Sequence, residues 1–199
     1  MLKTGAIKLS PANPFTWVSG WRSPIYCDNR STLGDVQVRS QICTAFAAVI
    51  RSKYPDAEVI AGVATGAIAH GMLVAEKLGL PFAYVREERK EHGLKKVVEG
   101  AEAAGKKVVV VEDLVSTGKS STNALLHLKE EKAKVLGMVA IFTYELDEAR
   151  KKFEEQGAEL TTLSTYTALI EQALADGYIQ PGDVEALKKW RSAPDKFLK

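Results

Sequence analysis

The stretch KKVVVVEDLVSTGKSST, from Lys106 to Thr122, decides the fold because it joins a buried strand to a helix through a short polar turn. Four consecutive valines predict a strand that is buried on both faces, as in a parallel sheet. The glycine and hydroxyl residues after it are typical of a turn that opens a helix. We therefore expect a strand that ends at the acids Glu112 and Asp113, and a helix from Gly118 to about Lys132.

The same alternation of strand and helix continues on both sides of this stretch. EVIAGV at 58–63 predicts a buried strand, and the helical pattern after it ends at Gly79. LPFAYV at 80–85 predicts a second strand. KVLGMVAIFTY at 134–144 predicts another, followed by an amphipathic helix in LDEARKKFEEQ at 146–156. The alternation predicts an α/β fold with a doubly wound, mostly parallel sheet.

The two ends of the chain have a different pattern from this core. Residues 1–35 contain short alternating pieces such as FTWV and PIYCD among prolines and glycines, which predict a small β hood of short antiparallel strands. VQVRSQICTAFAAVIRSKY then predicts a helix that leads into the core, and the tail from Ser164 predicts two more helices. We expect one domain over residues 1–199, divided into a hood at 1–35, a core at 36–163 and C-terminal helices at 164–199.

The composition indicates a soluble globular protein. Hydrophobic residues make up 46% and charged residues 26% of the 199 residues, which excludes a disordered chain. The net charge of +2 argues neither for nor against a nucleic-acid partner. Cys27 and Cys43 form no metal motif and no disulfide framework. With no apolar run long enough for a membrane span and no signal-peptide core, we expect a cytoplasmic protein without a membrane partner.

The Gly-Lys-Ser at residues 118–120 raises the question of an ATP-binding P-loop. A P-loop needs a glycine five positions before the glycine of Gly-Lys-Ser, so that backbone amides can surround the phosphates. Asp113 stands at that position, and its carboxylate would repel a phosphate. The P-loop interpretation fails.

What remains is a turn suited to one phosphate monoester and a pair of acids suited to a sugar. Small and hydroxyl residues at a helix start offer N–H and O–H donors to a phosphate. Glu112 and Asp113 are acceptors that suit sugar hydroxyls or a hydrated Mg²⁺. The alternative is an ordinary strand-to-helix turn with a helix cap, which the residues of the turn alone do not exclude.

VVVVEDLVSTGKS resembles the phosphoribosyl-pyrophosphate signature of type I phosphoribosyltransferases, and the rest of the chain is similar to the orotate-specific branch of that family. FTWVSGWRSPIYCDNR resembles the hood that closes over the pyrimidine. AGVATGAIAHG resembles the loop that contacts pyrophosphate, and YVREERKEHGLKKVVEG the mobile catalytic loop. The resemblance covers nearly the whole chain. It implies transfer of a 5-phosphoribosyl group from phosphoribosyl pyrophosphate to orotate, with orotidine 5′-monophosphate and pyrophosphate as products, in pyrimidine biosynthesis.

The resemblance also implies roles for individual residues. Lys90, His92 and Asp113 would be catalytic, and Ser116 would touch orotate. Lys90 and His92 would reach the diphosphate from the other subunit of a homodimer with shared active sites, and Mg²⁺ would be carried by the diphosphate instead of being held directly by protein ligands. The other implied substrate contacts are Tyr26, Cys27, Thr65, Gly66, Arg86, Glu112, Leu114, Val115, Thr117, Gly118, Lys119 and Ser120.

Three positions depart from the family pattern, and two other functions compete. Val18 replaces a lysine common in the hood, Glu87 replaces a lysine of the loop, and Tyr144 stands where some members place an arginine against the orotate carboxylate. Arg22 is a candidate to replace the missing hood charge. A phosphoribosyltransferase for a purine is the nearest competing enzyme. Regulators of this fold that bind nucleic acid usually carry an added helix-turn-helix or a strongly basic face. The charge of this chain is nearly balanced, so we expect no nucleic-acid partner.

Overall fold

The computed structural model describes residues 1–17, 20–87 and 96–197. Their centre is a six-stranded sheet with the order β10-β9-β8-β5-β6-β7, in which β7 is antiparallel to its neighbour and the other pairs are parallel. This confirms the predicted doubly wound, mostly parallel sheet. Its strands are β5 (Val59–Val63), β6 (Phe82–Val85), β7 (Val98–Gly100), β8 (Lys107–Val115), β9 (Lys134–Thr143) and β10 (Leu160–Thr165).

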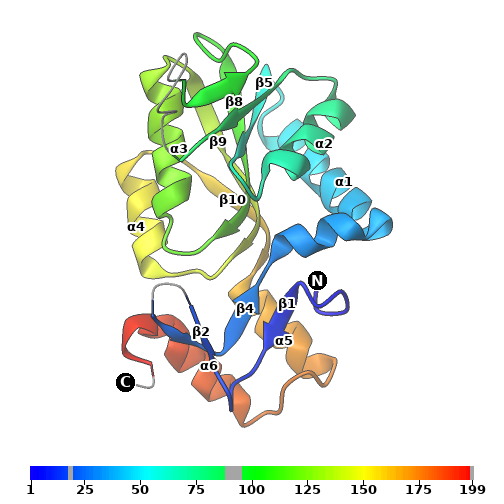
Figure 1. Cartoon of the computed structure of the whole chain (residues 1–199), viewed down its shortest axis with the longest axis vertical. Helices are drawn as coiled ribbons and strands as arrows, with labels where there is room; N and C mark the ends of the chain where they lie inside the picture. Colours follow the sequence, from blue (N-terminus) through cyan, green and yellow to red (C-terminus); the bar gives the residue numbers. More distant parts are fainter. Residues whose placement is uncertain (18–19, 88–95, 198–199) are drawn as a thin grey trace.

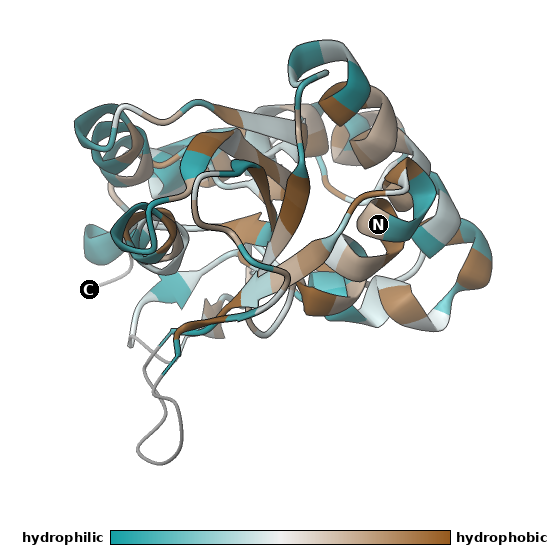
Figure 2. Ribbon diagram, turned by 90° about the horizontal axis from the view of Figure 1, so that it is seen from above, coloured by the Kyte–Doolittle hydropathy of each residue, from teal (hydrophilic) through white to brown (hydrophobic). Residues whose placement is uncertain are grey.

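Four helices cover the two faces of this sheet. α1 (Val36–Lys53) and α2 (Ile68–Leu78) lie together on one side, and α3 (Lys119–Glu130) and α4 (Asp147–Glu155) lie on the other (Figure 1). Gly79 ends α2 with a left-handed conformation, as the sequence predicts for a helix stop. Figure 2 shows the hydrophobic strands in the middle of the molecule and helices of mixed hydropathy around them.

The hood consists of two short antiparallel pairs, as predicted for residues 1–35. β1 (Ile7–Leu9) pairs with β4 (Ile25–Cys27), and β2 (Phe15–Thr16) pairs with β3 (Arg22–Ser23). A 3₁₀ helix, η1 (Asn29–Gly34), then joins β4 to α1, with the Asp28 carboxylate accepting a hydrogen bond from the Arg30 amide at its start. The hood therefore leads directly from β4 into the core through η1.

The C-terminal helices pack beneath the hood. α5 (Tyr166–Ala175) and α6 (Asp183–Ser192), with the 3₁₀ turn η2 (Pro194–Lys196), lie at the same end of the molecule as β1, β2 and β4 (Figure 1). Trp190 of α6 is fully buried, contacts the rings of Trp17, Tyr144 and Tyr166, and donates from Nε1 to the Arg22 carbonyl at 3.1 Å. This aromatic cluster joins the hood to the tail.

Two strands were not predicted. The segment YVREERKEHGLKKVVEG at 84–100 was expected to contribute a loop after the strand LPFAYV, which is wrong for Val98–Gly100, because these residues pair with β6 as the edge strand β7. β10 extends the sheet at the other edge to Thr165, two residues past the expected end of the core. Residues 88–95, which include Lys90 and His92, lie outside the described residues.

The core is the apolar interior on both sides of the sheet. Val108, Val109, Val110 and Val111 are fully buried, which confirms the two-sided burial predicted from their sequence. Within the described ranges, none of the helices combines the length and the apolar composition needed to cross a bilayer.

We predict that Trp190→Ala lowers the free energy of unfolding by roughly 3–5 kcal/mol, because it removes a fully buried ring and leaves a cavity between hood and tail. Urea denaturation measures this loss. Tyr178→Ala is the matched control, because its ring is 47% exposed and its removal should change stability by less than about 0.5 kcal/mol. A loss below about 1 kcal/mol for Trp190→Ala would show that the cluster does not hold the hood to the tail.

Candidate active site

A cavity of about 560 Å³ opens where β5 and β8 end side by side. The chain leaves β5 through α2 toward β6, and leaves β8 through α3 toward β9, so the connections after the two strands diverge. Ligand sites of doubly wound sheets lie at such a switch point. The cavity is lined by Cys27, Asp28, Arg30, Val63, Ala64, Thr65, Gly66, Glu87, Glu112, Asp113, Leu114, Ser116, Thr117, Gly118, Lys119 and Ser120.

Asp113 and Gly66 approach each other very closely across this cavity. A Cβ atom on Gly66 would lie 2.5 Å from Cγ of Asp113, so no larger residue fits at position 66 without displacing the carboxylate. Thr65 lines the cavity beside Gly66, and the Ala64–Thr65 peptide bond is cis. The two predicted segments, the loop after β5 and the acid pair of β8, therefore meet at one point.

Glu112 and Asp113 have different environments although they are adjacent. Side chains alternate along a strand, and Glu112 is 3% exposed with its carboxylate accepting hydrogen bonds from Ser121 Oγ and the Asp113 amide, each at 2.9 Å. Burial raises the pKa of Glu112 well above its usual value, and the charge of Asp113 and a side-chain hydrogen bond with it add to this shift. Glu112 therefore braces β8 against α3, while the Asp113 carboxylate lies against Gly66.

The turn from Ser116 to Ser120 offers donors to an anion. Gly118 has a φ of 78° and packs against Ala149 of α4, which a side chain at this position would displace. Gly118 is also the N-cap of α3 and makes no side-chain capping bond, so the first amides of the helix are not covered by a side chain of the cap. A phosphate monoester suits this arrangement of uncapped amides and hydroxyl groups.

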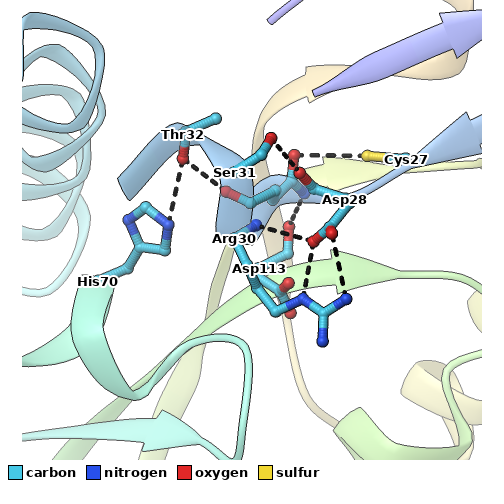
Figure 3. A network of polar contacts seen from close by, with 8 residues as sticks. Cys27, Asp28, Arg30, Ser31, Thr32, His70 and Asp113 are labelled. Atoms are coloured by element: carbon cyan, nitrogen blue, oxygen red, sulfur yellow. Dashed lines mark hydrogen bonds and ion pairs between the residues drawn. The ribbon is translucent and has the colours of Figure 1, made fainter. Parts of the chain in front are cut away.

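The other wall of the cavity comes from β4 and the start of η1 (Figure 3). Cys27 was predicted to lie here, but the sequence analysis missed Asp28 and Arg30. These two form an ion pair, with Arg30 Nε 2.7 Å from Asp28 Oδ1. Burial, together with the charges of Asp113 and Asp28, raises the pKa of Cys27 to about 12, so its thiol stays protonated at neutral pH. The motif Cys-Asp-Asn-Arg at 27–30 was the only local signal for this wall.

Several predicted residues lie away from this cavity. Arg86 does not line it and pairs with Glu99 at 3.3 Å. Tyr26 is 44% exposed and Val115 is buried, and neither side chain lines the cavity. Tyr144 belongs to the aromatic cluster instead of facing a ligand. Lys90, His92 and Val18 lie outside the described residues.

A second cavity, of about 710 Å³, lies between Trp21, the segment 145–148 and the segment 191–195. Four carboxylates line it, from Glu145, Asp147, Glu148 and Asp195, and its Arg191 is already paired with Glu145 at 3.0 Å. Such a wall would repel a polyphosphate. The cavity at β5 and β8 is therefore the better site for an anionic ligand.

We predict that wild-type protein becomes less stable relative to Glu112→Gln as the pH rises above about 4.5. A carboxyl group whose pKa is raised by folding stabilises the fold below its unfolded pKa and loses that contribution as the pH rises through its folded pKa. Glutamine has the same shape and does not titrate. Thermal unfolding of both proteins across this pH range measures the difference, and parallel curves would show that Glu112 does not titrate abnormally.

Comparison with known proteins agrees with the site. The family model of the phosphoribosyl transferase domain matches residues 29–166 of this chain. The chain is 51% identical to an orotate phosphoribosyltransferase of Porphyromonas gingivalis, over 99% of this chain and 94% of the relative, and 52% identical to that of Lactococcus lactis subsp. cremoris strain SK11, over 96% and 91%. The crystal structure of orotate phosphoribosyltransferase from Aeropyrum pernix superposes with a TM-score of 0.78 at 29% identity, covering 90% of this chain and 97% of that chain. The predicted resemblance is confirmed, and the chain belongs to the orotate phosphoribosyltransferase family.

Proposed function

We propose that this protein transfers the 5-phosphoribosyl group of phosphoribosyl pyrophosphate to orotate, giving orotidine 5′-monophosphate and pyrophosphate, as a step of pyrimidine biosynthesis. The observation that carries this proposal is the meeting of Asp113, Gly66 and the Ser116–Ser120 turn around one cavity at the switch point of the sheet. Relatives of near-equal length that carry the name of this enzyme support the choice of orotate over a purine.

Each part of the cavity suits one part of the substrates. The carboxylate of Asp113 accepts hydrogen bonds from the ribose hydroxyls. The amides and hydroxyls of the turn after β8 bind the 5′-phosphate, and the backbone at Thr65 and Gly66 faces the diphosphate. Orotate lies between Ser116 and the wall that contains Cys27, and the backbone around Tyr26 and Cys27 holds the pyrimidine edge.

Catalysis then rests on positioning and on stabilisation of charge. As the bond from ribose to pyrophosphate stretches, positive charge develops on the ribose ring and negative charge on the leaving group. Arg86, Lys90 and His92 supply positive charge and a proton donor to the diphosphate. For Arg86 this requires release from Glu99, with which it is paired here. Holding the two substrates in line lowers the entropic part of the barrier.

Mg²⁺ is part of this proposal as an ion that arrives on the diphosphate. Among the residues that the structure describes, no three His, Cys, Asp or Glu side chains gather where they could cage a metal ion. An Mg²⁺ ion that keeps water and phosphate oxygens as its main ligands needs no such group of side chains. Bound there, Mg²⁺ would neutralise charge on the leaving pyrophosphate.

We further propose a cytoplasmic homodimer. Cys27 and Cys43 are both free thiols, which suits a reducing compartment. In the dimer, Lys90 and His92 of one subunit would complete the cavity of the other.

The first test is the loss of orotate absorbance with phosphoribosyl pyrophosphate and Mg²⁺, with uracil and purine bases as controls. Asp113→Asn should lower kcat/KM at least about tenfold, about 1.4 kcal/mol, mainly through a higher KM for phosphoribosyl pyrophosphate. Asp56→Asn is the matched control, since Asp56 pairs with Lys107 at the opposite end of β8. Wild-type protein that consumes no orotate would refute the proposed function, and unchanged kinetics for Asp113→Asn would remove this acid from the site.

The second test concerns the shared site. At phosphoribosyl pyrophosphate concentrations well below the raised KM of Asp113→Asn, this variant and Lys90→Ala should each have little activity. Their mixture should recover up to about a quarter of wild-type activity, since half of the dimers would be mixed and carry one intact site of two. Subunit exchange is followed with two differently labelled chains. If exchange occurs and activity stays at the level of the separate variants, Lys90 does not act across the dimer.

A further inference from the structure

Asn29 contacts the acid pair from a distant part of the chain. The residue is 1% exposed, and its Nδ2 atom donates to the Asp113 carbonyl at 2.6 Å across a sequence separation of 84. This hydrogen bond joins the first turn of η1 to β8 at the point where the Asp113 carboxylate faces the cavity. A buried amide of this kind is rigid because each unmade hydrogen bond would cost free energy.

The orientation of this amide is set by its neighbours. Cys27 Sγ lies 3.4 Å from Asn29 Oδ1, and the thiol stays protonated, so it donates to the amide oxygen. The oxygen therefore faces Cys27 and the nitrogen faces Asp113. The backbone of Asn29 is held as well, because Thr32 Oγ1 donates to its carbonyl at 2.5 Å.

His70 completes this buried network from α2. Because the Thr32 hydroxyl hydrogen is used on Asn29, its oxygen accepts from Nε2 of His70, 3.4 Å away. Burial lowers the pKa of His70, which keeps the ring neutral. In this arrangement His70 donates to Thr32, and Thr32 donates to the Asn29 carbonyl.

The Asp113 backbone depends on this bond because the sheet does not hold it on that side. The pairing of β5 with β8 ends at Gly62 and Val111, two residues before Asp113. The Asp113 amide donates to the Glu112 carboxylate at 2.9 Å, and its carbonyl accepts from Asn29. Two side chains thus supply the hydrogen-bond partners that a neighbouring strand would otherwise give to the amide and the carbonyl of Asp113.

We propose that Asn29 is a positioning residue for phosphoribosyl transfer, because its amide fixes the Asp113 carbonyl and with it the direction of the Asp113 carboxylate. The inference rests on the proposed function, in which that carboxylate holds the ribose hydroxyls. It also makes the hood a part of the ribose site, since Asn29 lies two residues after Cys27, at the end of the hood.

Two substitutions test this role. Asn29→Ala removes the donor, and Asn29→Asp places a second acceptor against the Asp113 carbonyl, which repels it. Both should raise the KM for phosphoribosyl pyrophosphate at least about tenfold, Asn29→Asp more than Asn29→Ala, while the KM for orotate changes less than about threefold. Titration calorimetry with phosphoribosyl pyrophosphate should show the same loss of affinity without any turnover.

Two controls separate positioning from stability. Ile50→Val shortens a buried core side chain of α1 that takes no part in the Asn29 network, so it should lower the melting temperature and keep the KM for phosphoribosyl pyrophosphate within about twofold. Asn13→Asp makes the same chemical change at an exposed site of the hood and should alter neither quantity. An equal rise of KM in Ile50→Val, or an unchanged KM in both Asn29 variants, would overturn the proposal.

If the Asn29 variants do not fold, a measurement on the wild-type protein tests the role of Asn29. In ¹⁵N NMR spectra, the side-chain amide protons of Asn29 should exchange with solvent far more slowly than those of Asn13 and should shift when phosphoribosyl pyrophosphate binds. Exchange as fast as that of Asn13, or no shift on saturation, would refute the role of Asn29. Since this reports on binding alone, it is independent of whether orotate is the acceptor.

Discussion

The contact between the Asp113 carboxylate and the backbone of Gly66 is the constraint around which the site is built. It brings the ends of two neighbouring strands so close that no side chain fits between them. The connections after these strands diverge, which opens the cavity beside the contact. The valine-rich interior of β8 provides the rigid support that such a close approach needs.

Different residues fix different groups of Asp113. Glu112 accepts hydrogen bonds from Ser121 of α3 and from the Asp113 amide, so this acid braces the strand, while the Asp113 carboxylate lies against Gly66. Asn29 reaches the Asp113 carbonyl from the hood. The acid is therefore fixed from the helix that follows β8 and from the hood that precedes the core, although neither lies beside it in the sheet. The hood is tied in turn to the tail through Trp190.

The main features of the fold followed from local patterns. Runs of apolar residues and the glycine stops predicted β5, β6, β8 and β9 and their helices, because burial and helix capping are local properties. β7 was missed because three residues within a charged segment carry no recognisable period, and only pairing with β6 makes them a strand. β10 was missed for a related reason, as all of its residues are half-buried and alternate weakly.

The site was predictable in part for the same reasons. The loop after β5 and the signature of β8 stood out as polar segments at strand ends, and the structure brings them together. The role of Asn29 could not be read from the local sequence, since its bond to Asp113 links residues far apart in the chain. Tyr144 was compared with an arginine of other family members, but its burial among aromatic rings depends on the tail packing beneath the hood.

The most direct measurement of the central claim is a crystal structure of this protein with phosphoribosyl pyrophosphate bound. We predict that the ribose hydroxyls lie within about 3.2 Å of the Asp113 carboxylate oxygens, with the 5′-phosphate on the amides of the turn before α3. Asn29 should still donate to the Asp113 carbonyl in that complex. A sugar bound away from Asp113, or a phosphate in the acid-lined cavity beside Arg191, would contradict the assignment of this site.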